Sequence, residues 1–320
     1  MPDNKPSPIH DATPSAIAVA ADRLRAGGLV ALPTETVYGL AARADSDSAV
    51  AAIYRAKGRP DFNPLIVHVA DMAMAGRYAV LDSRAIALIQ IFWPGPLTLV
   101  LPLKPSANIA KAVTAGLPTI ALRIPAHPVI RAVLTQLQLP LAAPSANHSG
   151  GVSPSCAAHV ANSLGRNVDM ILDGGPCVQG IESTIVALRP DHWQILRHGP
   201  ISEWQIAEIL GETSLNHATN LVAIEAPGQL ASHYSPGKPL RLNVDQAGSD
   251  EFHIGFGAIN GDVNLSERGD LAQSAAQLYA ALHMAAAAAQ SHIAVAPIPH
   301  HGIGIAINDR LNRAAITPPP

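Results

Sequence analysis

Short apolar runs alternate along this chain with helical segments, and a polar loop follows several of those runs. Leu29–Leu32 leads directly into the polar residues 34–36, and the apolar run that begins at Thr119 ends at Arg123. Strands that alternate with helices in this way predict an α/β fold with an open, twisted sheet of mixed strand direction. Open α/β sheets bind ligands in loops at the ends of their strands. We therefore expect the functional groups of this protein in those loops.

The apolar periodicity places the individual elements. A helix is predicted to begin at Thr13-Pro14, where threonine caps and proline fits the first turn, and to end before Gly27-Gly28. Further helices are expected near residues 47–56, around 82–91, and near 127–137, 155–164, 202–210, 270–290 and 304–314. Strands are expected near residues 29–32, 65–69, 97–103, 119–124, 141–143, 170–172, 184–188, 194–196, 252–256 and 293–296.

The length of 320 residues predicts one large and one small domain. Residues 1–12 are expected to form a flexible tail, and residues 13–210 a large α/β domain. From residue 211 to 238 the pattern weakens, and Pro227-Gly228 and Pro236-Gly237 interrupt it, which is typical of a linker. The pattern of strands and helices in residues 239–320 then predicts a small Rossmann-like α/β domain with its own core.

Composition excludes several classes of protein. Hydrophobic residues make up 48% of the chain, which is enough for two cores, and the net charge of -3 argues against a protein that mainly wraps nucleic acid. Two cysteines, Cys156 and Cys177, are too few for a disulfide framework and lack zinc spacing. The N-terminus resembles no signal peptide, and no run reaches about 20 apolar residues. We expect a cytoplasmic protein with free thiols and no membrane contact.

Two pairs of polar residues carry most of the chemical information. Lys57-x-Arg59 follows a predicted helix, and Ser145-x-Asn147 follows a predicted strand. Cations beyond a helix end often only complement its dipole. Two cations that are followed by Pro60 and then by the next strand are less ordinary. They suit binding of a polyphosphate, because enzymes that transfer phosphoryl or nucleotidyl groups depend mainly on positioning and on stabilising phosphate charge.

Other polar residues lie within or beside predicted strands. Arg123 ends an apolar run, so it needs a partner, which can be either a protein carboxylate or a substrate carboxylate. His68 interrupts a strand, where histidines are usually structural. Thr36 and Ser183 lie at junctions of loops and strands, where hydroxyls usually cap or turn the backbone.

Five segments together resemble the YrdC-like family of threonylcarbamoyl-AMP synthases, in its longer two-domain form. These segments are Pro33–Leu40, Lys57/Arg59, Ser145/Asn147, Trp93–Pro96 and His233-Tyr234. The resemblance extends from about Ala16 to Ala315. It implies an open mixed sheet of the YrdC-like type, followed by the small C-terminal domain, to which Ile307–Arg310 is similar.

The resemblance also implies an activity. It is that of a nucleotidyltransferase that converts L-threonine, bicarbonate or carbon dioxide, and ATP to threonylcarbamoyl-AMP and pyrophosphate, with Mg²⁺ on the phosphates. The product would serve the downstream machinery that modifies an adenosine of tRNA, and the resemblance leaves direct contact with tRNA open. The implied threonine-binding residues are Thr36, His68, Arg123, Ala143 and Ser183. The implied ATP-binding residues are Lys57, Arg59, Asn63, Thr119, Ser145, Asn147, Ser153, Arg197 and Tyr234, with Lys57 and Arg59 catalytic.

In two-domain relatives the linker crosses the catalytic mouth as a lid. Some of them carry a tyrosine where this chain has Ala231, so Tyr234 is our hypothesis for the side chain that covers the nucleotide. Two other functions stay open. One is a carbamoyl-transfer enzyme of the same fold that uses carbamoyl phosphate, and the other is a non-catalytic RNA-binding module.

Overall fold

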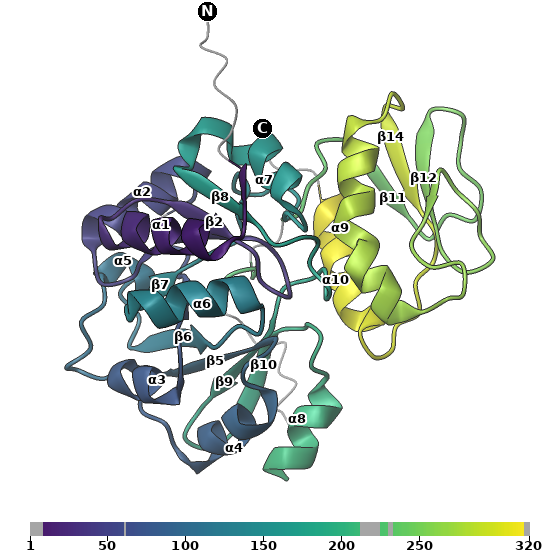
Figure 1. Cartoon of the computed structure of the whole chain (residues 1–320). Helices are drawn as coiled ribbons and strands as arrows, with labels where there is room; N and C mark the ends of the chain where they lie inside the picture. Colours follow the sequence, from purple (N-terminus) through teal and green to yellow (C-terminus); the bar gives the residue numbers. More distant parts are fainter. Residues whose placement is uncertain (1–8, 61, 212–224, 230–232, 317–320) are drawn as a thin grey trace, which may run out of the picture.

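The computed structural model describes residues 9–60, 62–211, 225–229 and 233–316, which form two α/β domains (Figure 1). The helices of the large domain are α1 (Pro14–Arg25), α2 (Asp47–Lys57), α3 (Met72–Tyr78), α4 (Ser83–Phe92), α5 (Lys111–Thr114), α6 (Pro128–Leu137), α7 (Ala157–Leu164) and α8 (Glu203–Leu210). Its strands are β1 (Ile9–Asp11), β2 (Val30–Leu32), β3 (Gly39–Arg43), β4 (Ile66–His68), β5 (Leu97–Pro102), β6 (Thr119–Arg123), β7 (Leu141–Ala142), β8 (Met170–Asp173), β9 (Thr184–Leu188) and β10 (Trp193–Arg197).

The ten strands of the large domain form one mixed sheet, which confirms the predicted open sheet. Their order is β1-β8-β2-β3-β7-β4-β6-β5-β9-β10. The sheet contains both parallel and antiparallel pairs. For example, β4 runs parallel to β6, whereas β5 runs antiparallel to β6 and parallel to β9. Strands from distant parts of the chain therefore become neighbours at the centre of the sheet.

The two faces of the central strands differ in what covers them. On one face, alternate residues such as Val67, Leu99 and Leu122 join the main core with residues of α2, α3, α4 and α7. The opposite face contributes only a small cluster of six buried residues, five on strands and the sixth, Ala226, in the linker. Because side chains alternate between faces, His68 and Arg123 lie on that second face. Helices α1 and α6 cover this face over β2, β3, β7 and β8, whereas no described helix joins the small cluster on β4, β5, β6 and β9, which leaves room for a ligand there.

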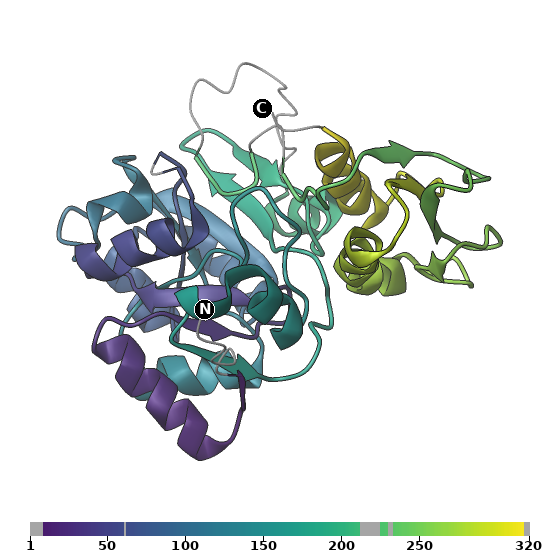
Figure 2. The same cartoon turned by 90° about the horizontal axis from the view of Figure 1, so that it is seen from above.

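The small domain has its own parallel sheet. Its strands are β11 (Leu240–Leu242), β12 (Glu251–Gly255), β13 (Val263–Asn264) and β14 (His292–Val295), in the order β11-β14-β12-β13, and its helices are α9 (Leu271–Ala287) and α10 (Gly304–Ala315). Both views place α9 and α10 between this sheet and the large domain (Figures 1 and 2). The two helices therefore form the side of the small domain that meets the large one.

Several elements differ from the sequence-based prediction. Ile9–Asp11 forms strand β1, which pairs in parallel with β8, so the prediction of a flexible tail is wrong for these residues. Residues 1–8 lie outside the described part of the chain. Strands β3, β11 and β13 and helix α5 were not predicted. All four are short, and Gly39–Arg43 is composed mainly of small residues, so neither pattern nor propensity marks it as a strand.

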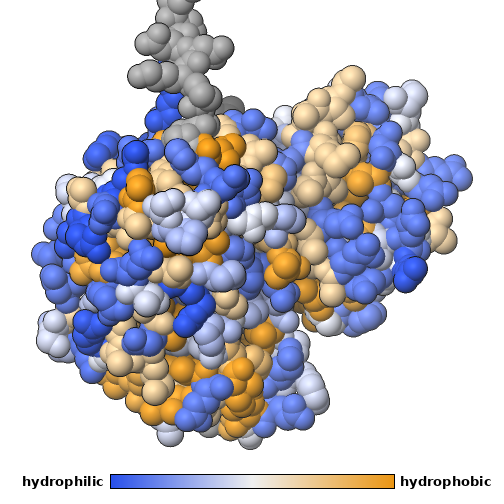
Figure 3. All heavy atoms as spheres, viewed as in Figure 1, coloured by the Kyte–Doolittle hydropathy of each residue, from blue (hydrophilic) through white to orange (hydrophobic). Residues whose placement is uncertain are grey.

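The surface mixes polar and apolar residues on the face that Figure 3 shows. Hydrophobic residues gather near α4, whose Ile91 is exposed. Among the residues that the structure describes, no helix combines the length and the apolar character that a membrane span requires.

Candidate active site

Arg123 is the centre of a buried polar cluster at the end of β6. Its guanidinium donates to the carbonyl of Gly95 (3.1 Å), to Oγ1 of Thr36 (3.0 Å) and to Oε1 of Glu35 (2.6 Å). Its partner here is therefore a protein carboxylate, one of the two alternatives that the sequence left open. An arginine has five N–H donors, so these three bonds leave one hydrogen on each terminal nitrogen for a ligand.

Glu35 lies in a loop whose shape depends on Thr34. The Thr34 hydroxyl accepts from the backbone N–H of Thr36 and of Val37 and donates to the Val37 carbonyl, which forms a tight turn. The turn directs Glu35 toward Arg123, and the second carboxylate oxygen accepts from the backbone N–H of Ala126. Burial raises the pKa of Glu35, but the charge and hydrogen bond of Arg123 outweigh burial and hold it below its usual range.

His68 is the neighbour of Arg123 across the sheet. The two residues are register partners of the parallel strands β4 and β6, so their side chains share a face. His68 is buried, and its Nδ1 has no hydrogen-bond partner among the described residues. Burial, helped by the charge of Arg123, lowers the pKa of His68 to about 3, so the ring is neutral near pH 7. A neutral, unpartnered ring nitrogen is available to hydrogen-bond a ligand.

Lys57 connects the Lys-x-Arg and Ser-x-Asn segments. Ser46 caps the start of α2, Gly58 ends it in the left-handed conformation, and Lys57 is its last residue. The Lys57 ammonium donates to the carbonyl oxygens of Ser145 (2.6 Å) and Asn147. Burial and the nearby charge of Arg59 lower the pKa of Lys57 well below its usual value. A buried cation of this kind is favoured by an incoming anion.

Arg59 and the two asparagines complete this part of the site. Arg59 donates to the carbonyl oxygens of Asn63 (3.3 Å) and Pro64 (3.1 Å), and burial lowers its pKa to about 10. The side-chain oxygens of Asn63 and Asn147 are buried, and neither has a partner within the described ranges. Buried polar atoms are nearly always hydrogen-bonded, so these two oxygens are available to accept from a substrate.

A third group of polar residues surrounds Arg197 at the end of β10. The guanidinium donates to the carbonyl (3.0 and 3.1 Å) and the hydroxyl (3.1 Å) of Ser183, and that hydroxyl lies 2.8 Å from Oγ1 of Thr98. A terminal nitrogen also donates to the carbonyl of Pro227, at 3.3 Å. Arg197 therefore holds the strand-end hydroxyl and the linker together.

The described part of the linker lies over these cations. His233 is buried, and burial lowers its pKa to about 3; the charge of Glu182 opposes this effect, and the charges of the three cations add to it. Gly228 has a φ of 88°, and a Cβ there would lie 2.9 Å from the side chain of Arg197 and 3.2 Å from the hydroxyl of Tyr234. Only glycine fits this position, between an arginine and the linker tyrosine. Ala231 lies outside the described residues.

The remaining predicted residues are placed less directly. Ser153 donates its hydroxyl to Glu182 at 2.6 Å. Thr119 is on the same face of β6 as Arg123 but at the opposite end of the strand, and Ala143 follows β7, where its N–H donates to the carbonyl of Ile66. The structure thus gathers most predicted residues around Arg123, Lys57 and Arg197, and it leaves Thr119 apart from these contacts.

Two carboxylates at the site were missed in the sequence. Glu35 is part of the recognised Pro33–Leu40 segment, but its contact with Arg123 was not foreseen. Glu182 comes two residues before the buried strand β9, and an acidic residue so close to a buried strand needs a partner. That partner is Arg310 of the small domain, at 3.1 Å. The pattern could have indicated that Glu182 is paired, but not with which residue.

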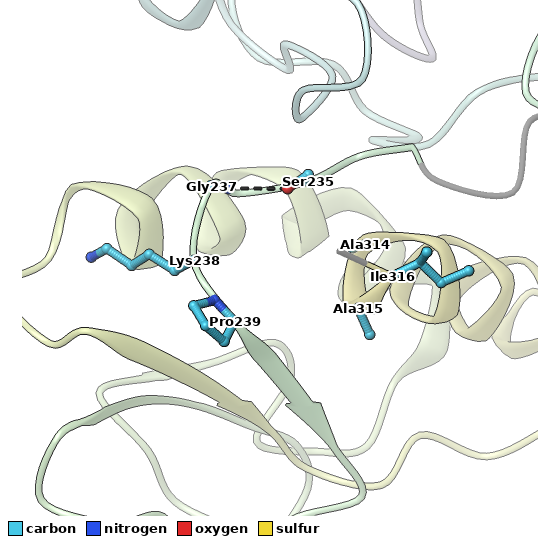
Figure 4. A pocket seen from close by; sticks show the side chains of 7 residues that line it. All are labelled: Ser235, Gly237, Lys238, Pro239, Ala314, Ala315 and Ile316. Atoms are coloured by element: carbon cyan, nitrogen blue, oxygen red, sulfur yellow. Dashed lines mark hydrogen bonds between the residues drawn. The ribbon is translucent and has the colours of Figure 1, made fainter. Parts of the chain in front are cut away.

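The site offers cations rather than metal ligands. Within the described part of the chain, no group of three or more His, Cys, Asp or Glu side chains could hold a metal ion. A separate cavity of about 220 Å³ lies where the linker enters the small domain, between residues 235–239 and the end of α10 (Figure 4). It contains none of the predicted substrate residues and is distinct from the site.

Known proteins resemble this chain over both domains. The Sua5/YciO/YrdC family model, described as telomere recombination, matches residues 22–199, and a model described as the threonylcarbamoyl-AMP synthase C-terminal domain matches residues 201–316. The threonylcarbamoyl-AMP synthase of Bacillus subtilis is 39% identical over 93% of this chain and 92% of its own length. That of Pyrococcus abyssi is 34% identical over 93% and 94%. A crystal structure of P. abyssi Sua5 complexed with L-threonine superposes with a TM-score of 0.87, at 32% identity and 97% coverage of both chains.

Proposed function

This chain belongs to the family of Sua5-type threonylcarbamoyl-AMP synthases, and from that premise we propose which substrates it uses and which residues bind them. The substrates are L-threonine, bicarbonate or carbon dioxide, and ATP, and the products are threonylcarbamoyl-AMP and pyrophosphate. The observation that carries the assignment of the site is the set of buried, unpartnered polar atoms of His68, Asn63 and Asn147 beside buried cations.

Threonine is assigned to the face of the sheet around Arg123. Each terminal nitrogen of Arg123 keeps one N–H beyond its bonds to Thr36 and Glu35, and these can hold the substrate carboxylate. The neutral ring of His68 lies beside it and offers Nδ1. Thr36, Ala143 and Ser183 complete the proposed set of threonine-binding residues.

ATP is assigned to the cations beneath the linker. Lys57 and Arg59 would neutralise the α-phosphate and the departing pyrophosphate, and Arg197 and Tyr234 would hold the nucleotide from the other side. Support comes from the linker, whose Pro227 carbonyl accepts from Arg197 at 3.3 Å and whose Gly228 packs between Arg197 and the hydroxyl of Tyr234. Asn63, Thr119, Ser145, Asn147 and Ser153 are the further proposed contacts to ATP.

The reaction requires mainly that the reactants meet in the correct orientation. The amine of threonine attacks carbon dioxide and loses a proton, which gives a carbamate. A carbamate oxygen then bonds to the α-phosphorus of ATP while the bond from that phosphorus to the bridging oxygen of pyrophosphate breaks. Lys57 and Arg59 stabilise the charge that develops on the phosphates. We assign no general base, because positioning alone contributes a large part of such rate enhancements.

Magnesium is proposed to arrive with ATP. Mg²⁺ prefers oxygen ligands and usually keeps several waters, so phosphate and water oxygens suffice to coordinate it. The two carboxylates near the site, Glu35 and Glu182, are already bonded to Arg123 and Arg310. The ion neutralises phosphate charge when it is bound.

The domain organisation and the biological setting also stay proposals. Residues 13–210 would form the catalytic domain, residues 211–238 a linker that closes over ATP, and residues 239–320 the small domain. A downstream transferase that modifies tRNA would consume the product, and the cytoplasmic location expected from the sequence remains a prediction. The match to synthases over both domains favours this function over carbamoyl transfer from carbamoyl phosphate and over RNA binding.

Pyrophosphate release tests the proposal. The protein is incubated with ATP and magnesium, with and without L-threonine and bicarbonate, and the products are analysed by mass. Release that requires both compounds, together with the mass of threonylcarbamoyl-AMP, is the expected result. Release that is independent of threonine would contradict the proposed substrate.

A further inference from the structure

A buried arginine of the small domain reaches the boundary between the domains. Arg310 of α10 has an exposed fraction of 0%, although its side chain is long and charged. Its Nε donates to Oε2 of Glu182 in the large domain (3.1 Å), and its Nη1 donates to Oδ2 of Asp309 (2.9 Å). Its Nη2 has no partner among the residues that the structure describes. A charge so deeply buried must be held by its neighbours.

Glu182 is the point at which several elements meet. Its carboxylate accepts from the hydroxyl of Ser153 at 2.6 Å and from the hydroxyl of Tyr279 on α9, at 2.8 and 3.0 Å to its two oxygens. Burial raises the pKa of Glu182, but the charges of Arg310 and Arg197 and the hydrogen bond from Ser153 together outweigh burial and lower the pKa to about 2. Glu182 directly precedes Ser183, whose carbonyl and hydroxyl bind Arg197. A movement of Glu182 would therefore move Arg197.

Tyr234 of the linker contacts Arg310 and Tyr279, the two residues of the small domain that also bond to Glu182. The guanidinium carbon of Arg310 lies 5.6 Å from the centre of the Tyr234 ring, within the range of a cation–π interaction. The rings of Tyr234 and Tyr279 stack with their centres 5.7 Å apart. Tyr234 is thus held from the side of α9 and α10.

The backbone of the linker is held from both domains at the same place. The N–H of His233 donates to the carbonyl of Arg313 on α10 (3.4 Å), and the N–H of Ser235 donates to the carbonyl of Gly150 (2.8 Å). Gly180, two residues before Glu182, packs so closely that a Cβ there would lie 2.4 Å from the Cα of Ala276 on α9. Both the linker and the segment that precedes Ser183 therefore pack against the small domain.

We propose that Arg310 is a positioning residue that makes the small domain part of the nucleotide site. Arg310 fixes the position of Glu182 and thereby the positions of Ser183 and Arg197. It also holds the ring of Tyr234 over Lys57, Arg59 and Arg197. A buried ion pair adds little net stability compared with apolar residues of equal volume, but it fixes a geometry, since breaking it leaves an uncompensated charge. The part of this inference that concerns ATP rests on the proposed function.

The test compares two Arg-to-Lys substitutions in the small domain. Arg310→Lys keeps the charge but loses the fork of donors that spans Glu182 and Asp309. Arg241→Lys is the matched control, because Arg241 also pairs with a glutamate, Glu251, in an exposed position away from the large domain. The readouts are KM and kcat for ATP, thermal unfolding, and hydrogen exchange of peptides that contain His233 and Ser235.

Arg310→Lys should raise KM for ATP by roughly tenfold or more and accelerate exchange at His233 and Ser235. Exchange in α1 should stay as in the wild type, and Arg241→Lys should change none of these quantities. If Arg310→Lys instead lowers only the unfolding temperature, with KM and linker exchange unchanged, Arg310 is structural and the proposal fails.

A second variant keeps the test decisive if Arg310→Lys does not fold. Tyr279→Phe removes only the hydroxyl that Glu182 accepts and keeps the ring that stacks on Tyr234. It should change KM and linker exchange in the same direction, by roughly threefold. Hydrogen exchange needs no substrate. It therefore tests whether Arg310 holds the linker in place even if the wild-type protein makes no threonylcarbamoyl-AMP.

Discussion

Arg123 and Glu35 are 88 residues apart in the sequence, and they form a buried ion pair of 2.6 Å in the fold. The pair holds the guanidinium beside His68, because Glu35 is itself fixed by the backbone N–H of Ala126 and by the turn at Thr34. The arginine thus uses three of its five N–H donors within the protein, and the remaining two are the donors that we propose for threonine. This double role leads to the first prediction.

Arg123→Ala should raise the threonine concentration required for half-maximal activity by roughly 10- to 100-fold, the value of a lost charged hydrogen bond. The ATP requirement should change far less. Glu35 would also lose its partner, which costs about 3–5 kcal/mol of unfolding free energy. The double variant Arg123→Ala/Glu35→Gln should recover part of that stability without recovering threonine affinity. Steady-state kinetics and urea unfolding measure both effects, and equal increases for threonine and ATP would contradict the assignment.

Lys57→Met should lower kcat/KM for ATP by roughly 100- to 1,000-fold, because a preorganised donor to developing charge is lost. The variant also leaves the carbonyl oxygens of Ser145 and Asn147 without this donor, at a cost of about 1–3 kcal/mol in stability. Lys111→Met is the matched control, since Lys111 is exposed on α5. Calorimetric titration with ATP separates binding from catalysis. Unchanged ATP affinity and unchanged kcat in a folded Lys57→Met protein would exclude the proposed role.

Gly180→Ala should weaken the docking of the two domains. Its φ of 67° is strained for alanine, and the new Cβ would meet the backbone of α9, which cannot move alone. We expect a loss of about 2–4 kcal/mol in unfolding free energy, from overpacking plus backbone strain. Gly116→Ala is the control, because its φ is 78° but nothing lies within 4 Å of its Cβ, so only about 1 kcal/mol should be lost. Similar losses in urea unfolding of the two variants would argue against a tight interface.

Buried histidines should make the protein less stable in acid. The pKa of His68 is lowered from 6.5 to about 3, so below pH 6.5 the unfolded state binds a proton that the folded state does not bind. The unfolding free energy should therefore fall as the pH drops below 6.5, by up to about 1.4 kcal/mol per pH unit for each such histidine. His233 adds a second contribution in the same direction.

Denaturant unfolding of the wild type and of His68→Gln at several pH values between 6.5 and about 5 tests this, above the range in which most carboxylates titrate. The slope of stability against pH should be smaller for His68→Gln by the contribution of one histidine. If both proteins show the same slope, His68 is not neutral and buried in the folded state.

Much of the local structure could be predicted. Thr13 and Pro14 begin α1 as expected, and α2 ends at Lys57, because capping and helical periodicity depend only on neighbouring residues. The quoted motifs indicated the family correctly, and the polar ends of strands indicated a candidate site, which stays a prediction. Strand β1 escaped prediction because Ile9–Asp11 is exposed and contains one apolar residue, and β3 because Gly39–Arg43 consists mainly of small residues of low strand propensity.

The pairings within the site were decided only by the tertiary structure. His68 meets Arg123 because β4 and β6 are neighbours in a particular register, and Glu182 meets Arg310 across 128 residues because the small domain docks on the loop before β9. Apolar periodicity indicates which side chains are buried, but it carries no information on strand order, register or domain docking. Local sequence was therefore enough to name the polar groups that need partners, while long-range packing determined which partners they find.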